Sequence, residues 1–188
     1  MTVKTLARGW RPVAAGRLPS GGAKAAWLAD YVNRSWQELG HPCSETSVEL
    51  AVSYAREREA CFDPARAVLV HGDAQPNNLL QVPRSSDGHG GFRLIDPEGM
   101  ASEPAHDVGV VLRDWNDDLL TGDAAAVVFG RHQMVSHLTG IDPEPIWQWS
   151  FVERVSSGLF LLSLGHDRQA RTFLEAADRL TSEVPPWR

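Results

Sequence analysis

The chain has 188 residues, of which 43% are hydrophobic and 22% are charged, so it is long enough to bury a core within one domain. Its 24 acidic residues against 18 Lys and Arg give a formal net charge of −6. This balance disfavours a general nucleic-acid binder, whose affinity depends on a basic surface. A cationic small molecule suits an acidic chain better.

The sequence also argues against a membrane protein and against a secreted disulfide scaffold. It has no run of about 18–20 apolar residues and no apolar signal-peptide core near its N-terminus. Two cysteines, Cys43 and Cys61, are too few for a disulfide framework, and with His41 they fit no standard zinc spacing. We therefore expect two small buried thiols and a cytoplasmic protein without a membrane or nucleic-acid partner.

The first third of the chain predicts a lead-in and two helices. Residues 1–24 are rich in Gly, Pro, Ala and basic residues, which is typical of an irregular segment. Apolar residues at helical spacing predict a helix over 25–39, which Gly40 and Pro42 end. Ser44 can cap a second helix that runs to about Ala60.

Short strands and then further helices are expected after this point. Residues 67–70 predict a buried strand, and residues 79–82 and 92–95 predict two more, joined by a glycine-rich hairpin loop over 83–91. One apolar stripe then runs from Val108 to Leu119, and further helices are expected over 124–138, from Asp142 to Leu164, and over 167–181. The expected fold class is α+β, predominantly α-helical, with a small β-hairpin.

Two carboxylates and one amide follow the predicted strands. Asp73 and Asn78 come directly after the first strand, and Asp96 stands at the end of a hairpin strand. We expect these groups to meet at one edge of a small sheet. In phosphoryl transfer, one carboxylate accepts a hydroxyl proton, while another carboxylate and an Asn carbonyl hold Mg²⁺ on the nucleotide phosphates. The protein-kinase catalytic loop has this spacing.

Three ordered motifs carry a family resemblance. They are HGDAQPNNLL, LIDPEGM and EPAHDVGVVLRDW, within residues 68–115, with weaker similarity over 153–162. In these motifs the chain resembles the catalytic C-terminal lobe of the aminoglycoside phosphotransferase family, and within it the streptomycin and hydroxyurea resistance kinase branch. The resemblance implies a protein-kinase-like fold and an antibiotic-resistance kinase. It also implies ATP and Mg²⁺ as cofactors and a small polycationic or sugar-like acceptor, such as streptomycin.

The resemblance also assigns roles to individual residues. It makes Asp73 the catalytic base, Asn78 a metal ligand, and Asp96 the principal Mg²⁺ ligand, with Asn78 and Asp96 thereby binding the nucleotide. His71 and Asp107 would support the loop structurally. Pro97 and Glu98 stand where protein kinases have Phe and Gly after the metal-binding Asp, so the role of Glu98 is open.

The family's substrate-binding side chains suggest three further candidates. In aminoglycoside kinases, acidic residues of the helical lobe bind the ammonium or guanidinium groups of the substrate. By this resemblance Asp114, Asp117 and Asp118 are candidate substrate ligands. A solvated helix face is the alternative interpretation of the same residues.

The resemblance divides the chain into the lead-in, 1–24, and a kinase-like lobe, 25–188, without the N-terminal nucleotide lobe of this fold. Residues 16–24 do not replace that lobe, because Lys24 is displaced from the phosphate-loop pattern. The chain could obtain a nucleotide lobe from a separate chain or a dimer partner. It could also be a truncated or inactive lobe that acts as a binding module.

An enzyme of a different class is the last alternative. His106 and Asp107 form an HD pair, and His71 and Asp73 could complete the ligand set of an HD-type metal phosphohydrolase. Those domains are all-helical, whereas His71 ends a predicted strand. We therefore favour the phosphotransferase.

Overall fold

The computed structural model describes residues 2–13, 16, 18–83 and 91–184. The helices are α1 (Thr2–Gly9), α2 (Gly21–Glu38), α3 (Glu45–Ala60), α4 (Pro104–Arg113), α5 (Asp117–Thr121), α6 (Ala124–Thr139), α7 (Pro143–Ser163) and α8 (Asp167–Glu183). The strands are β1 (Val68–Val70), β2 (Leu79–Val82), β3 (Gly91–Leu94) and β4 (Met100–Ser102), and a 3-10 turn, η1 (Pro76–Asn78), precedes β2. The predicted α+β, predominantly helical class is confirmed. None of the described helices is long and apolar enough to cross a membrane.

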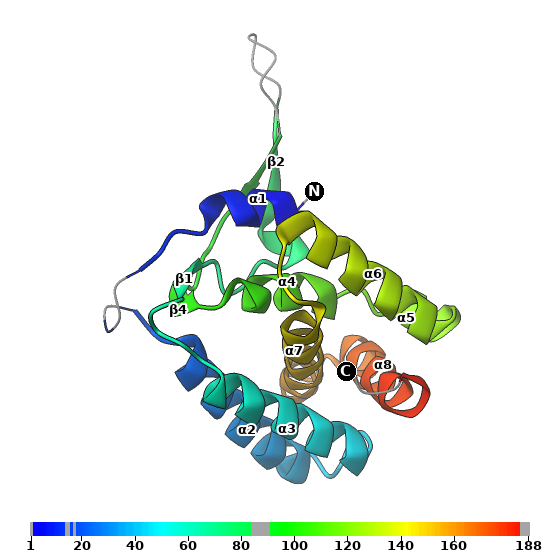
Figure 1. Ribbon diagram of the computed structural model, residues 1–188. Helices are drawn as coiled ribbons and strands as arrows, with labels where there is room; N and C mark the ends of the chain where they lie inside the picture. The colour runs from blue at the N-terminus through cyan, green and yellow to red at the C-terminus, as the bar shows by residue number, and fades with distance from the viewer. Residues whose placement is uncertain (1, 14–15, 17, 84–90, 185–188) are drawn as a thin grey trace.

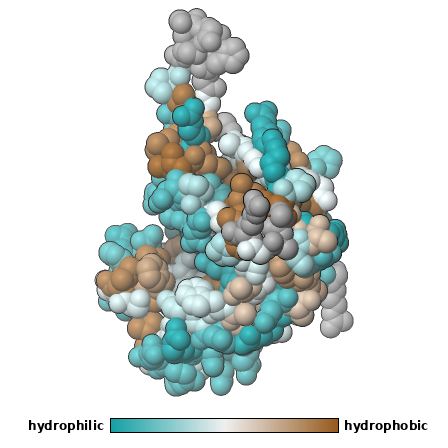
Figure 2. All heavy atoms as spheres, turned by 90° about the vertical axis from the view of Figure 1, so that its left-hand side faces the viewer, coloured by the Kyte–Doolittle hydropathy of each residue, from teal (hydrophilic) through white to brown (hydrophobic). Residues whose placement is uncertain are grey.

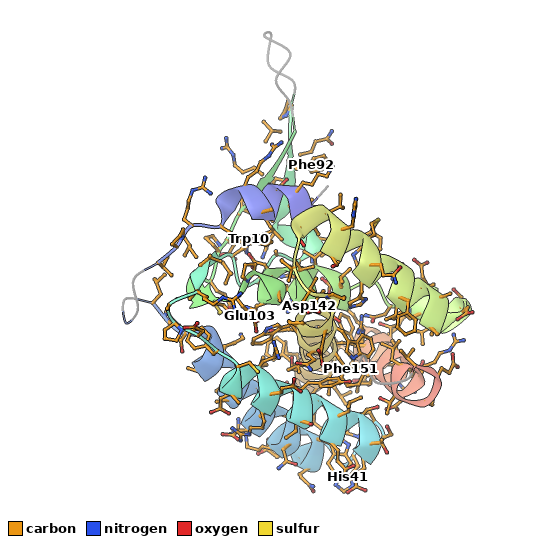
Figure 3. The ribbon with its side chains drawn as sticks, in the orientation of Figure 1. Trp10, His41, Phe92, Glu103, Asp142 and Phe151 are labelled. Atoms are coloured by element: carbon orange, nitrogen blue, oxygen red, sulfur yellow. The ribbon has the colours of Figure 1, made fainter. Side chains whose placement is uncertain are left out.

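Helix α7 forms the centre of the core. It packs against α2, α3, α4, α6 and α8, so apolar residues all round the helix are buried. Trp147, Trp149 and Phe151 are among the largest fully buried side chains of the chain. Figure 3 shows Phe151 among the helices that surround α7. Asp142 caps α7 by accepting a hydrogen bond from the Glu144 amide, as the sequence predicted.

The lead-in predicted for residues 1–24 is wrong in part, because α1 and the start of α2 are helical. The α1 helix is short and amphipathic, and it buries Val3 and Leu6 toward α4 and α6. The Ser20 hydroxyl caps α2 by accepting from the Ala23 amide. Gly21 opens this helix because its backbone packs so closely on Ser102 that any side chain there would collide.

Two small antiparallel sheets carry the loops of interest. In one, β1 pairs with β4, which the sequence did not predict, and Val68 lies opposite Ser102. In the other, β2 pairs with β3 from Leu79↔Leu94 to Val82↔Gly91, and this hairpin projects from the helical body (Figure 1). Most of the predicted hairpin loop, residues 84–90, lies outside the described residues. Figure 2 shows apolar surface at the base of the hairpin.

Two further sequence predictions need correction. The apolar stripe from Val108 to Leu119 is not one helix, because α4 ends at Arg113 and α5 begins at Asp117; Trp115, between them, is 51% exposed. The two cysteines are free but not both buried. Cys61 caps the solvent-facing end of α3 and is exposed, and Cys43 is half-buried.

Candidate active site

The loop that carries Asp73, residues 71–78 (the Asp73 loop), is tied to α4 by a buried carboxylate. Asp107 is fully buried and accepts hydrogen bonds from the backbone amides of His71 (3.0 Å) and Gly72 (2.8 Å). It also accepts from the indole Nε1 of Trp10 at 2.9 Å. Figure 3 shows Trp10 between α1 and the helix that carries Asp107. Three donors on one buried carboxylate fix the start of the loop.

His71 joins this loop to the chain that follows β3. Its Nε2 lies 3.0 Å from the carbonyl oxygen of Ile95, and its Nδ1 lies 3.3 Å from the backbone nitrogen of Asp73. Because the carbonyl only accepts and the amide only donates, these partners assign the ring proton to Nε2. The imidazole therefore braces the loop and does not face the Asp73 carboxylate.

The Asp73 carboxylate is held by three side chains. Its Oδ1 accepts from Arg113 Nη2 at 2.8 Å. Its Oδ2 accepts from Gln75 Nε2 at 2.9 Å and from Asn78 Nδ2 at 3.0 Å. Asn78 Nδ2 also donates to the backbone carbonyl oxygen of Asp73 at 2.8 Å, so the end of the loop is bound back onto its middle. The carboxylate is one quarter exposed, fixed in orientation and open to a ligand.

Asp73 lines a pocket of about 350 Å³ between the loop and helices α2, α4, α7 and α8 (the Asp73 pocket). Its charged lining consists of four carboxylates and two cations: Asp73, Glu98, Asp114, Glu153, Lys24 and Arg113. Its aromatic lining consists of Trp27, Tyr31, Phe160 and Phe173. The two rings on α2 stack with their centroids 5.0 Å apart, and Trp27 is 52% exposed. Acidic groups and aromatic faces together favour a cationic ligand.

Arg113 bridges the pocket's carboxylates. Its Nη1 donates to Glu153 at 2.9 Å, and its Nε lies 3.6 Å from Asp114. Burial would lower the pKa of Arg113, but the charges of Glu153, Asp114 and Asp73 outweigh burial and raise it. The guanidinium therefore stays charged at the back of the pocket.

The expected metal ligands flank the β2–β3 hairpin, with Asn78 directly before β2 and Asp96 shortly after β3. Asp96 follows Ile95, whose amide donates to the Asn78 carbonyl at 2.9 Å, so the two predicted ligands stand on neighbouring backbone. Asp96 is exposed and has a left-handed φ of +56°. Within the described ranges, no three His, Cys, Asp or Glu side chains gather to hold a metal. One carboxylate with one amide oxygen still suits Mg²⁺, which usually takes its other ligands from water and phosphate.

The three candidate substrate ligands are placed apart. Asp114 lines the Asp73 pocket, and burial raises the pKa of its carboxyl. Asp117 lines a neighbouring hollow with Gln75 and Asn77. Asp118 instead forms an ion pair with Arg131, away from the pocket. Only Asp114 therefore shares a pocket with Asp73.

The geometry does not assemble the ligand set of the HD alternative. His106 faces Glu153 across α4 and α7, with 3.1 Å between Nε2 and Oε1. Asp107 is occupied by its three donors, and the His71 ring turns to Ile95. These side chains serve packing and loop support.

Sequence reasoning missed Arg113, Glu153, Gln75 and Lys24 as residues of the site. Lys24, rejected as a phosphate-loop lysine, lines the Asp73 pocket and lies 3.5 Å from Glu98. One signal for Glu153 was available, since Glu153 and Arg154 are adjacent charged residues in the middle of a mostly apolar helix. Charged residues at such positions are buried only when they have partners.

No protein-family model matches the chain, and no curated protein sequence matches it significantly.

Proposed function

We propose that this chain is an ATP- and Mg²⁺-dependent phosphotransferase that acts on a hydroxyl group of a small cationic molecule. An aminoglycoside such as streptomycin is the acceptor that the sequence resemblance implies. The observation that carries the proposal is the Asp73 carboxylate, which three side chains hold in one orientation at an open, acidic pocket.

In this reaction Asp73 orients the acceptor hydroxyl and accepts its proton. The hydroxyl oxygen forms a bond to the γ-phosphorus of ATP, and the bond from that phosphorus to the bridging oxygen of ADP breaks. The proton passes to Asp73 and then to solvent. Because phosphoryl transfer needs little covalent participation by the enzyme, a fixed carboxylate supplies most of what this residue must do.

Asn78 and Asp96 would hold the metal ion. The side-chain nitrogen Nδ2 of Asn78 donates to Asp73, whereas the side-chain oxygen Oδ1 of Asn78 accepts no hydrogen bond from the part of the chain that the structure describes. That oxygen and the exposed Asp96 carboxylate are the hard oxygen donors that Mg²⁺ prefers. When bound, the ion would neutralise negative charge on the nucleotide phosphates.

The charge and shape of the Asp73 pocket support a cationic acceptor. Its carboxylates outnumber its cations by four to two, and Lys24 already lies over the Trp27 ring at 5.4 Å. An ammonium group of a ligand could use the same aromatic face. A hydroxyl on that ligand would then stand near Asp73.

One observation favours a second candidate, a binding module without turnover. The donors that hold Asp73 take up most of the acceptor capacity of its carboxylate, and Arg113 already neutralises its charge. On this alternative the lobe binds a cationic small molecule and either stays inactive or needs a nucleotide lobe from another chain. The phosphotransferase and the binding module would bind the same cationic ligand, but only the phosphotransferase would transfer a phosphoryl group to it.

The deciding experiment measures ADP release and product mass with Mg·ATP and a panel of streptomycin, other aminoglycosides, choline and simple sugars. Calorimetry with the same acceptors reports binding separately. We expect Asp73→Asn to lower transfer at least about 100-fold and to leave acceptor binding within a few-fold. Glu175→Gln, an exposed α8 position, is the matched control.

Each outcome decides between the candidates. Transfer that is lost in Asp73→Asn supports the phosphotransferase. Binding of an acceptor without transfer by the wild-type chain favours the binding module. Absence of both binding and transfer would contradict the two candidates together.

A further inference from the structure

A line of charged and polar groups runs from the core to Asp73. His106 and Arg113 stand seven residues apart on α4, which places them on one face of the helix, two turns apart. Both reach Glu153 on α7. His106 Nε2 lies 3.1 Å from Glu153 Oε1, and Arg113 Nη1 donates to Oε2 at 2.9 Å. The second nitrogen of the same guanidinium, Nη2, reaches Asp73 at 2.8 Å.

Close packing of α4 on α7 makes this line possible. Gly109 lies between His106 and Arg113, and a Cβ built there would stand 2.5 Å from Trp149 Cβ and 2.8 Å from the Ser150 nitrogen. A glycine is therefore needed for the helices to approach this closely. Glu153 lies one turn after Trp149 on α7 and therefore faces the side of α4 that carries His106 and Arg113.

The Glu153 side chain is held in one orientation because it is buried between two hydrogen-bond partners. Its side chain is 5% exposed, and each carboxylate oxygen has one of the two partners. Burial alone would raise the pKa of Glu153, but the hydrogen bond from His106 and the charge of Arg113 outweigh it and lower the pKa to about 2. A buried carboxylate held from both sides fixes the guanidinium plane in turn, since Arg presents a rigid fork of donors.

The fixed guanidinium distinguishes the two oxygens of Asp73. A carboxylate oxygen accepts about two hydrogen bonds. Oδ2 receives two, from Gln75 and Asn78, whereas Oδ1 receives only the one from Arg113 among the described residues. Oδ1 therefore keeps one acceptor site for a ligand.

We propose that Glu153 and Arg113 are positioning residues, which clamp the Asp73 carboxylate so that the remaining acceptor site of Oδ1 receives the hydroxyl of the acceptor. This inference rests on the proposed function. Glu153 acts only through Arg113. Arg113 orients Asp73 and takes no part in the bond changes.

The test compares Glu153→Gln, Arg113→Gln and Arg113→Lys with the wild-type chain in the transfer assay. We expect each to lower kcat roughly 10- to 100-fold, as misplacement of a catalytic group does, while KM for the acceptor stays within about threefold. Arg113→Lys keeps the charge, but its single ammonium cannot span Glu153 and Asp73, so it should not restore kcat. Arg56→Gln, which removes an exposed arginine with two carboxylate partners, is the matched control and should keep the wild-type kcat.

Stability measurements make the test independent of turnover. Circular dichroism establishes whether each variant folds. Arg113→Lys, which keeps a cation at this position, carries the test if Glu153→Gln does not fold. A double-mutant cycle of Arg113→Lys and Asp73→Asn, measured by urea unfolding, then shows whether the effects of the two substitutions on the unfolding constant are independent. Coupled side chains should change the unfolding constant severalfold beyond the product of the single effects.

The outcomes separate the clamp from the proposed function. Folded variants that keep the wild-type kcat would overturn the clamp and leave the phosphotransferase standing. If the wild-type chain transfers to no acceptor, the proposed function fails, and the unfolding cycle decides the clamp alone. Independent effects of the two substitutions would then overturn the clamp, and coupled effects would support it.

Discussion

The two segments that carry the candidate site, the Asp73 loop and residues 95–99, differ in how they are held in the fold. The Asp73 loop is held by hydrogen bonds with Asp107 on α4, Asn78 in η1 and Arg113, and the side chains of all three are largely buried. The segment over residues 95–99 (the Asp96 segment) is mostly exposed. Backbone hydrogen bonds attach it to the Asp73 loop: the Ile95 amide donates to Asn78 O at 2.9 Å, and the Gly99 amide donates to His71 O at 3.2 Å.

This difference separates what the fold prepares from what a ligand would complete. Groups that must hold one orientation are fixed by buried, charge-assisted hydrogen bonds on rigid helices. The Asp96 carboxylate, the proposed metal ligand on the exposed segment, remains in solvent, where a free carboxylate costs little. On the proposed function, the acceptor side would be preorganised and the nucleotide side open.

Asp107→Ala should cause the largest loss of stability. It leaves the Trp10 indole and the amides of His71 and Gly72 without their acceptor in a buried site. We expect the free energy of unfolding to fall by about 3–5 kcal/mol in urea titrations. Glu175→Ala, at an exposed position of α8, should change it by less than about 0.5 kcal/mol. Similar values for the two variants would show that Asp107 does not secure the loop.

Acid should lower the stability of the helical core, because two of its buried side chains have lowered pKa values. Burial lowers the pKa of His132 from 6.5 to about 4, although its hydrogen bond to Val128 opposes the shift. The unfolded chain therefore binds the proton first, and stability falls as the pH drops from about 6.5 to about 4, by up to about 3 kcal/mol. Glu153, whose pKa is lowered to about 2, adds a loss below about pH 4.5.

The measurement is urea unfolding at pH values from 7 to 4. His132→Gln should flatten the curve between pH 6.5 and pH 4.5. His137→Gln, an exposed histidine on the same helix, should leave the slope unchanged. A slope that survives in His132→Gln would contradict the assignment to this histidine.

The contact between α4 and α7 can be tested with a pair of glycines. A Cβ at Gly109 would meet Trp149 and the backbone of Ser150, whereas one at Gly130, inside α6, would meet nothing within 4 Å. Helix propensity favours Ala at both positions by up to about 1 kcal/mol. We expect Gly130→Ala to raise the midpoint of thermal unfolding, and Gly109→Ala to lose about 1–3 kcal/mol through overpacking. Equal shifts of one sign would argue against close packing at Gly109.

Local patterns in the sequence were enough to predict most elements. Helix ends at Ser44 and Asp142 and strands near residues 68, 79 and 92 follow from capping residues and short β-branched runs, and the structure has them. The N-terminal helix was missed because eight residues carry too short a periodic pattern. The strand β4 was missed because its three residues pair only with a distant strand.

The partners of Asp73 could not be predicted in the same way. Gln75 and Asn78 are local, and the loop motif contains both. Arg113 and Glu153 reach the site only because α4 packs on α7, a contact that no pattern within either helix encodes. Clusters formed across helices depend on tertiary distances, which explains why Asp114 shares the pocket and Asp118 does not.

The smallest expected change in stability is at Asp96, where the exposed side of the contrast can be tested without disturbing the fold. Its φ of +56° is left-handed backbone, which Asn tolerates as Asp does and Ala does not. Asp96→Asn should therefore unfold within about 0.5 kcal/mol of wild type, whereas Asp96→Ala should lose about 1 kcal/mol. In calorimetric titrations with ATP, we expect wild type to bind more tightly with Mg²⁺ than without it, and Asp96→Asn to lose that difference. A folded Asp96→Asn chain that keeps the Mg²⁺ effect would remove Asp96 from the metal site, and the charge that distinguishes this segment would then serve something other than a cation.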